Sequence, residues 1–388
     1  MITTELPALL GLICLIISGS YQLLTLAALA TWKYATRTPH RPGPRACPPI
    51  TLLKPLCGAE SQLYESLKSF FLQNYPQFQL VFGVRDPADP AIAIVRRLSS
   101  EFPAVPVTLV INSHQHGSNR KVSNLINMLP SARHDALAIV DSDAEVGSDY
   151  LATIAAALQP PGVGLVTCTY RSVPTKGLWS RLGAMYINDW YIPSVLLAWL
   201  FGHRRFASGQ TLFLRRQTLE RLGGFQAIAN HLADDYELGE RVRALGLQTV
   251  VCDYVTRAHH HEPTFEDLLS HETRWMRTLR ALRPLEFGFL FLSFGFPLAL
   301  FGFALTLPTP SLSAPCGLLL LIIVFLRLAL HIAAHWDDTR INLTDLWLIP
   351  LRDLLLLCVW AHALLTSQVK WRGHAFSVNA QGVMRPLH

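Results

Sequence analysis

The sequence contains no Cys-x-x-Cys pair, and its seven cysteines are an odd number spread along the chain. Cysteine zinc sites use closely spaced pairs, and disulfide frameworks use even numbers of cysteines. Neither type of site is therefore predicted, and the cysteines are typical of a reducing compartment. The sequence also lacks internal repeats and low-complexity tracts, so a repeat architecture is not predicted.

Charged residues make up only 15% of the 388 residues, whereas 51% are hydrophobic. The hydrophobic share is higher than that of a typical soluble enzyme. The excess is concentrated in three stretches long enough to cross a bilayer, Leu6–Thr31, Phe287–Leu307 and Cys316–Ala334. We therefore predict an integral membrane protein with an N-terminal anchor (1–33), a linker (34–48), a water-soluble domain (49–283), C-terminal membrane segments (284–366) and a tail (367–388).

No Lys or Arg precedes the first apolar stretch, whereas four basic residues follow it within residues 33–45. Basic residues stay on the cytoplasmic side, so the soluble domain is predicted to face the cytoplasm. A cleaved signal peptide would have a basic start and a shorter apolar run, which favours an uncleaved anchor. Arg277, Arg280 and Arg283 precede the second stretch and favour the same side.

The last apolar region, Leu343–Leu365, is interrupted near its centre by Pro350, Arg352 and Asp353. Each charge at bilayer depth costs about 2.5–3.5 kcal/mol on insertion scales. A full span would also leave the basic tail outside, against the positive-inside tendency. We therefore predict an interfacial or re-entrant element here rather than a full span.

The soluble region has no basic helix and no pattern of stacking aromatics, so nucleic acid is not a predicted partner. The net charge of +6 arises mainly from Lys and Arg beside the apolar stretches. Such clusters suit anionic lipid headgroups and a phosphate-bearing substrate.

The soluble region alternates short β-branched runs with amphipathic segments, which favours an α/β fold with a mostly parallel sheet covered by helices. The predicted strands are Ile50–Leu53, Leu80–Val84, Val107–Ile111 and Ala136–Val140, and the predicted helices are Ser61–Gln73, Val122–Met128 and Glu237–Leu245.

Two carboxylates, Asp141 and Asp143, directly follow the predicted strand Ala136–Val140. Ligands of α/β proteins bind at the carboxyl ends of the strands, so both side chains are predicted at a ligand-binding edge. Carboxylate oxygens suit Mg²⁺ or Mn²⁺, and such an ion would neutralise a diphosphate. A strand-end Asp is also a common turn or cap residue, so this pair alone does not decide the function.

Three further motifs follow the same order along the chain. Asp86 ends the second predicted strand, the pair Asp234-Asp235 precedes a helix, and the segment His271–Trp275 ends in Arg274-Trp275. Asp86 could be a plain turn residue, and Arg274 and Trp275 could anchor a helix at the headgroups. The triplet His259–His261 is not predicted to bind one ion, because adjacent side chains diverge on a regular backbone.

The order and type of these motifs resemble the inverting glycosyltransferases of families 2 and 21, over nearly the whole chain. The resemblance implies a Rossmann-like glycosyltransferase A-type domain that uses a UDP-sugar donor and Mn²⁺ or Mg²⁺. It assigns metal binding to Asp143 and Asp141, and catalysis to the base Asp235 with Asp234 as its helix-capping neighbour. It assigns donor binding to Asp86, Asn119, Lys121, Asp141, Arg274, Trp275 and Arg277. His271 departs from the Gln or Arg of the general motif, and Asn119–Lys121 could instead be a solvated loop.

Few apolar segments follow the motifs, so the channel of a processive synthase is not predicted. The aromatic-rich segment Leu178–Gly202 reads as an interfacial helix suited to a lipid acceptor, or else as a buried core helix. Within the family, Asn188–Trp190, Ser208–Gln210 and Asp234–Gly239 resemble ceramide glucosyltransferases and their bacterial hopanoid-biosynthesis relatives. That branch implies transfer of N-acetylglucosamine from UDP-N-acetylglucosamine to bacteriohopanetetrol. Ceramide glucosylation, a processive synthase and a catalytically silent scaffold or carrier remain alternatives.

Overall fold

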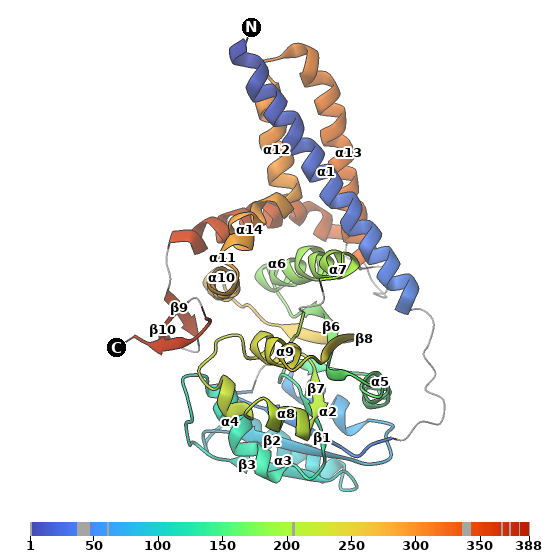
Figure 1. Ribbon diagram of the computed structural model, residues 1–388, viewed down its shortest axis with the longest axis vertical. Helices are drawn as coiled ribbons and strands as arrows, with labels where there is room; N and C mark the ends of the chain where they lie inside the picture. The colour runs from blue at the N-terminus through green and yellow to red at the C-terminus, as the bar shows by residue number, and fades with distance from the viewer. Residues whose placement is uncertain are drawn as a thin grey trace. The chain divides into compact units, whose positions relative to one another are not determined.

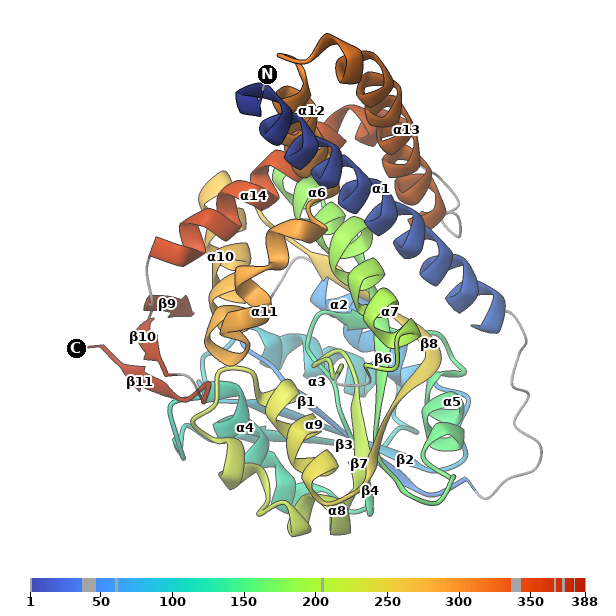
Figure 2. The ribbon, with the colours of Figure 1, turned by 45° about the horizontal axis from the view of Figure 1, so that its top comes forward.

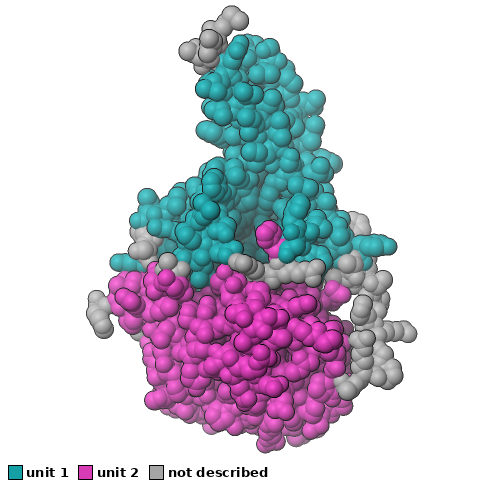
Figure 3. All heavy atoms as spheres, viewed as in Figure 1, with its two compact units in different colours: residues 1–37, 176–202, 262–373 teal, residues 38–175, 203–261, 374–388 magenta. Residues whose placement is uncertain are grey.

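The computed structural model describes residues 2–36, 47–59, 62–203, 206–335, 343–365, 368–371, 374–379 and 381–387 (Figure 1). The chain forms two compact units, each made from three chain segments (Figure 3). We call them the helical unit (1–37, 176–202 and 262–373) and the sheet unit (38–175, 203–261 and 374–388). The helical unit thus includes residues 176–202 and 262–283, which the sequence-based boundaries assign to the soluble domain.

The sheet unit is built on one eight-stranded sheet with the order β3-β2-β1-β4-β7-β6-β8-β5. Its strands are β1 (Ile50–Pro55), β2 (Phe78–Val84), β3 (Val107–Ile111), β4 (Ala136–Ile139), β5 (Ala144–Glu145), β6 (Val163–Pro174), β7 (Leu212–Arg215) and β8 (Gln248–His260). Strands β1 to β4 are mutually parallel, as predicted. Strand β7 runs antiparallel to both β4 and β6, whereas β6 and β8 are parallel, so the sheet is mixed.

Helices cover both faces of this sheet (Figure 2), so its central strands β1 and β4 are buried on both sides. Along β1, Leu52 packs into one apolar cluster and Leu53 into the other, as the two-residue period of a strand requires. The first cluster contains α2 (Leu63–Phe71), α3 (Ala91–Glu101) and α5 (Tyr150–Ala157), and the second contains α4 (Arg120–Met128), α8 (Arg216–Arg221) and α9 (Asp234–Ala244). The predicted elements therefore all exist, with ends shifted by two residues or fewer at most positions. Near the C-terminus, β10 (His374–Val378) pairs antiparallel with β11 (Met384–Pro386).

The helical unit contains three closely packed helices, α1 (Ile2–Thr36), α12 (Gly295–Thr306) and α13 (Pro310–Ala334), which stand side by side in Figure 1. Gly11 of α1 faces Gly302 of α12 so closely that a Cβ on either glycine would lie within 3 Å of the other's carbonyl oxygen. Small residues that let helix backbones approach are typical of membrane helix pairs. Near the other end, Lys33 donates to the carbonyl oxygen of Ala333 at 2.8 Å, so α1 and α13 run in the same direction.

Within the part of the chain that the structure describes, three helices are long and apolar enough to cross a membrane, Glu5–Tyr34, Pro310–Ala334 and Thr344–Leu365. The predicted span Phe287–Leu307 is instead broken into α11 (Pro284–Gly288), a 3₁₀ turn (Leu290–Ser293) and the short apolar helix α12. The third long helix includes α14 (Ile349–Leu365), which runs across α1 and α13 rather than along them (Figures 1 and 2).

The segment Leu178–Gly202 forms α6 (Leu178–Met185), a π-helical segment (Tyr186–Tyr191) and α7 (Ile192–Leu200). The long helix α10 (Phe265–Leu282) begins at a capping box between Thr264 and Asp267. Two charges that the sequence places in an apolar stretch are buried and paired. Arg352 of α14 donates to both carboxylate oxygens of Glu272 in α10, and Asp353 accepts from Arg327 of α13 at 2.8 and 2.9 Å.

Candidate active site

The carboxylates predicted at the end of β4 lie together with the Asp234-Asp235 pair in the sheet unit. Lys121, in the first turn of α4, connects them: its Nζ lies 2.7 Å from Asp141 Oδ1 and 3.1 Å from Asp234 Oδ2. The N-cap residue of α9 is Ala233 and Asp234 is the first residue within the helix, so the prediction that Asp234 caps the helix is wrong. Its side chain lies instead beside the Lys121 ammonium group, at 3.1 Å.

The loop before β7 holds the other carboxylates. The Gly209 N–H donates to Asp235 Oδ2 at 3.0 Å, and the Gly209 carbonyl accepts from the Asp141 N–H at 3.1 Å. The side-chain Nε2 of Gln210 donates to Asp143 Oδ1 at 2.9 Å. This loop reaches the carboxyl end of β4 because β7 is antiparallel to β4 and therefore starts where β4 ends. The sequence singled out Ser208–Gln210 only as a resemblance and gave it no role.

Lys54 is a fully buried residue of β1 that the sequence analysis missed. Its Nζ donates to the carbonyl oxygen of Asp141 at 2.8 Å and lies 3.7 Å from the centre of the Phe70 ring. Burial lowers the pKa of Lys54 to about 7, although Asp143 and Asp141 oppose that shift. The sequence does contain a signal for Lys54, because it is a lysine within a largely apolar strand. A buried lysine needs a polar or charged partner.

Two carboxyl groups of the site, those of Asp143 and Asp235, have raised pKa values for the same physical reason. Burial raises the pKa of Asp143, and the neighbouring charge of Asp141 raises it further. Burial and Asp234 raise the pKa of Asp235 to about 6, while Lys121 partly offsets them. Crowded buried carboxylates with raised pKa values are typical of sites that bind a cation or transfer a proton.

The donor set at the end of β4 fits a hard divalent cation. Asp143 and Asp141 offer carboxylate oxygens, and their mutual repulsion would be relieved by a positive ion. Beside them, the Oε1 atom of Gln210 is buried and has no hydrogen-bond partner among the described residues. Asp143 and Asp141 are therefore the residues that would hold Mg²⁺ or Mn²⁺.

The remaining predicted residues take different places. Asp86 is exposed and accepts the Ala88 N–H at 2.8 Å, which is the turn geometry considered from the sequence. Asn119 is buried rather than part of a solvated loop: it caps α4 and donates to the His231 carbonyl at 2.8 Å. Asn119 therefore fixes the start of the helix that carries Lys121.

Arg274, Trp275 and Arg277 lie on α10, in the helical unit. The ring of Trp275 stacks on Tyr186 at 5.3 Å between centroids and lies 4.1 Å from the ring of His271. Arg277 donates to the carbonyl of Gln368 and lies 3.3 Å from His362 Nε2. Trp275 is thus held by aromatic neighbours within its own unit.

The three adjacent histidines bind three different partners, as predicted from their divergence. His259 contacts Glu145, His260 contacts Ser172 and His261 contacts Thr175.

The sequence matches glycosyl transferase family 21 over residues 11–384, nearly its whole length. The chain belongs to glycosyltransferase family 21. Ceramide glucosyltransferase 3 of Caenorhabditis elegans is 23% identical over 238 residues, which cover 61% of this chain and 52% of that relative. Ceramide glucosyltransferase of Candida albicans is 32% identical over 114 residues, covering 26% and 21%. The chain thus spans about half or less of the length of the curated relatives it matches.

Among solved structures, a mannosyltransferase of Pyrobaculum calidifontis in complex with GDP-Man and Mn²⁺ resembles this family 21 chain with a TM-score of 0.53 at 19% identity. The likeness covers 92% of this chain and 97% of that one. It supports the glycosyltransferase A-type fold predicted from the motifs.

We expect Gly209→Ala to reduce turnover by up to about 10²-fold, which is the cost of misplacing reacting groups by an ångström. A Cβ at Gly209 would lie 2.5 Å from Asp141 Oδ2 and 3.0 Å from Lys121 Nζ, so that ion pair must shift. Steady-state turnover of purified protein measures the effect. Gly288→Ala is the matched control, since a Cβ there meets no atom within 4 Å. Equal turnover in the two variants would show that this close contact does not matter.

Proposed function

We propose that the protein transfers a sugar, with inversion, from a UDP-sugar to a hydroxyl group of a membrane lipid. The observation that carries this proposal is the meeting of Asp141 and Asp143 with Asp235 around the Gly209–Gln210 loop, in a chain of family 21. One carboxylate pair suits a metal-bound diphosphate, and a separate carboxylate suits a general base.

Asp235 is the proposed base. Inversion is a direct displacement, so a base must remove the proton of the acceptor hydroxyl as its oxygen attacks the anomeric carbon. The N–H groups of Gly209 and Tyr236 donate to the two oxygens of Asp235 at 3.0 and 2.7 Å, which orients the carboxylate. Lys121 supplies positive charge beside it.

The leaving group is the UDP diphosphate. A divalent cation held by Asp143 and Asp141 would neutralise the charge that develops on it. We further propose that Arg274, with Trp275 and Arg277 beside it, contacts the donor diphosphate, because a guanidinium binds phosphate oxygens bidentately. Asp86 is proposed to contact the uracil, and Asn119 to act through the position of Lys121.

The acceptor is proposed to be a lipid at the cytoplasmic face of a bacterial inner membrane. Within the helical unit, α1 and α13 run in the same direction and α12 runs in the opposite direction. The curated relatives include ceramide glucosyltransferases. The motif resemblance favours N-acetylglucosamine as the sugar and bacteriohopanetetrol as the lipid, with glucose and ceramide as the second candidate pair.

A product assay tests the reaction. Purified full-length protein is incubated with a panel of UDP-sugars, Mn²⁺, and either bacteriohopanetetrol or ceramide, and products are identified by mass spectrometry. One N-acetylhexosamine on the hopanoid is the expected result. Hexose on ceramide would keep the chemistry and change the substrates, and a ladder of products would indicate a processive synthase. UDP binding without any product would favour the silent carrier.

We expect the transfer rate to require added Mn²⁺ or Mg²⁺ and to be abolished by a chelator. Asp143→Ala should remove both activity and metal stimulation, because Asp143 is the proposed ligand. Initial rates across a titration of each ion measure this. A rate unaffected by chelation would contradict the metal assignment without affecting the assignment of the base.

We expect kcat/KM to fall as the pH drops below about 6, by about tenfold per pH unit at the acid end. The sign follows from the role of Asp235: the base works ionised, and its raised pKa means that protonation begins near pH 6 rather than pH 4. A pH–rate profile of the wild-type protein measures the acid limb. An identical limb in the residual activity of Asp235→Asn would assign it to another group.

A further inference from the structure

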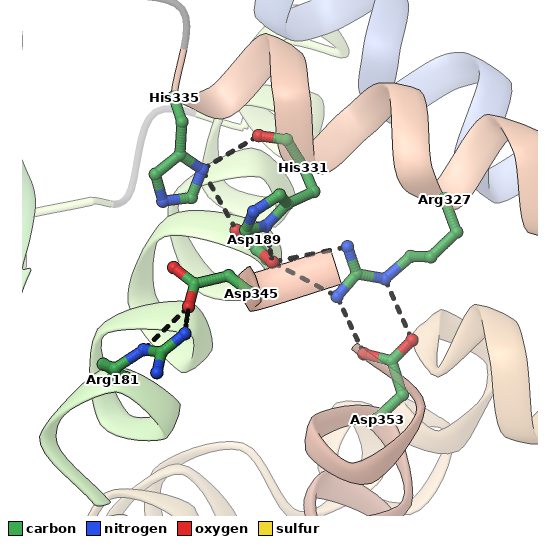
Figure 4. A network of polar contacts seen from close by, with 7 residues as sticks. All are labelled: Arg181, Asp189, Arg327, His331, His335, Asp345 and Asp353. Carbon is green, nitrogen blue, oxygen red and sulfur yellow. Dashed lines mark hydrogen bonds and ion pairs between the residues drawn. The ribbon is translucent and has the colours of Figure 1, made fainter. Parts of the chain in front are cut away.

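The helical unit contains a second cluster of metal-binding side chains that the transfer reaction does not use. Asp189 lies in the π-helical segment between α6 and α7, and His331 and His335 lie one turn apart at the end of α13 (Figure 4). We call these three residues the Asp-His-His cluster. Residues four positions apart on a helix project from the same face, so both imidazoles can reach one point.

The three side chains converge closely. Asp189 Oδ2 lies 2.7 Å from His331 Nδ1, and Asp189 Oδ1 lies 3.7 Å from His335 Nδ1. The two imidazole rings are 4.3 Å apart between centroids, and one ligand atom from each residue lies within 4.8 Å of the others. Figure 4 shows both rings turned toward the carboxylate. His335 Nδ1 also lies 2.8 Å from the carbonyl oxygen of His331, a contact that it would exchange for the ion.

The cluster is buried and incompletely satisfied. The side chains of Asp189, His331 and His335 are 0%, 1% and 13% exposed. Asp189 Oδ1 is buried and accepts no hydrogen bond from any residue that the structure describes. A buried carboxylate oxygen without a hydrogen bond is destabilising, so a ligand there would be stabilising.

The surrounding charges favour a cation. Arg327 lies 3.4 Å from Asp189 Oδ2, but it also donates twice to Asp353 at 2.8 and 2.9 Å. One guanidinium therefore faces two carboxylates. The nearby Arg181 and Asp345 pair with each other and leave this balance unchanged. The group formed by Asp189, Arg327 and Asp353 thus carries one excess negative charge.

We propose that Asp189, His331 and His335 form a binding site for Zn²⁺ or a similar borderline transition-metal ion. Two imidazoles and one carboxylate suit zinc, whereas Mg²⁺ and Ca²⁺ prefer oxygen ligands. Three protein ligands leave a fourth tetrahedral position for water. The ion would connect the end of α13 to the segment between α6 and α7, and so fix the arrangement of these elements within the helical unit.

The proposal separates two metal sites by chemistry. The carboxylates Asp141 and Asp143 offer only oxygen ligands, and they suit the hard ion of the transfer reaction. The Asp-His-His cluster offers mainly nitrogen. The Asp143→Ala variant should therefore still bind zinc at the Asp-His-His cluster. Loss of zinc from this cluster should not change the dependence of turnover on Mn²⁺ or Mg²⁺.

Metal analysis of the full-length, tag-free protein in detergent tests the proposal. The protein is equilibrated with Zn²⁺ and passed over a desalting column, and bound metal is measured by mass spectrometry. We expect about one zinc per chain, strongly reduced in His331→Gln and in His335→Gln. His362→Gln, at an exposed histidine of α14 in the same unit, is the matched control and should keep the metal. Equal zinc in all variants, or none in the wild type, would overturn the proposal.

A second measurement does not depend on the variants folding. Co²⁺ in place of Zn²⁺ in the wild-type protein should give the visible absorption of a tetrahedral site with nitrogen and oxygen ligands. A zinc-selective chelator should lower the melting temperature, and Zn²⁺ but not Mg²⁺ should restore it. Absence of both the absorption and the chelator effect would show that the cluster is held by hydrogen bonds alone.

Discussion

Replacing Asp235 by Asn should lower turnover by about 10²–10⁴-fold, the usual contribution of a general base. An amide cannot accept the acceptor proton, although its oxygen can still take a hydrogen bond from the Gly209 or the Tyr236 N–H. Donor binding should therefore change little. Single-turnover rates together with UDP-sugar affinity from calorimetry separate the two effects.

The exposed carboxylate of Asp253 on β8 provides the control for this experiment. Asp253→Asn makes the same chemical change away from the described site and should leave turnover unchanged. If Asp235→Asn kept wild-type turnover, another group would be the base, or the hydroxyl would lose its proton to water. If it lost donor binding as well, Asp235 would serve the donor rather than the acceptor.

Replacing Arg352 by Met should destabilise the protein by about 3–5 kcal/mol, because it leaves the buried carboxylate of Glu272 without its partner. Arg352 and Glu272 are 2% and 1% exposed and are joined by two hydrogen bonds. Burial raises the pKa of Glu272, and Arg352 opposes that shift. Without the arginine the carboxyl can take up a proton, so the loss should grow as the pH rises. The melting temperature in detergent at several pH values measures this.

The double variant Arg352→Met with Glu272→Met tests the cause of that loss. An apolar pair of similar size in a buried position is often as stable as the ion pair it replaces. We therefore expect the double variant to recover most of the melting temperature. A double variant as unstable as Arg352→Met would mean that the arginine acts mainly through other contacts, such as its 5.5 Å approach to the Tyr186 ring.

The sequence predicted where Asp141 and Asp143 lie because a buried strand can be recognised from a short run of consecutive residues. Ala136–Val140 is a continuous apolar run, so the next polar residues, Asp141 and Asp143, had to lie at a sheet edge. The roles of Gly209 and Lys54 depend instead on strand order. Only the antiparallel placement of β7 beside β4 brings the Gly209 loop to that edge, and local patterns carry no information about such pairings.

The charges in the last apolar region show a similar limit. The sequence analysis predicted that Arg352 and Asp353 would make insertion of this segment into the bilayer unfavourable. In the structure each has a partner from a distant part of the chain, Glu272 in α10 and Arg327 in α13. The apolar pattern predicted the helix itself, but the partners that make its charges tolerable are more than twenty residues away.

The division of the sheet unit into separate chain segments has a consequence for biosynthesis. Strands β7 and β8 flank β6, yet they are translated only after segment 176–202 of the helical unit has left the ribosome. The nascent chain therefore exposes one edge of β4 until β7 has emerged, and one edge of β6 until β8 has emerged. Unpaired strand edges promote aggregation, so early insertion of α1 would help by holding the growing chain at the bilayer, away from other nascent chains. Pauses in translation before β7 should accordingly reduce the yield of folded protein more than pauses after β8.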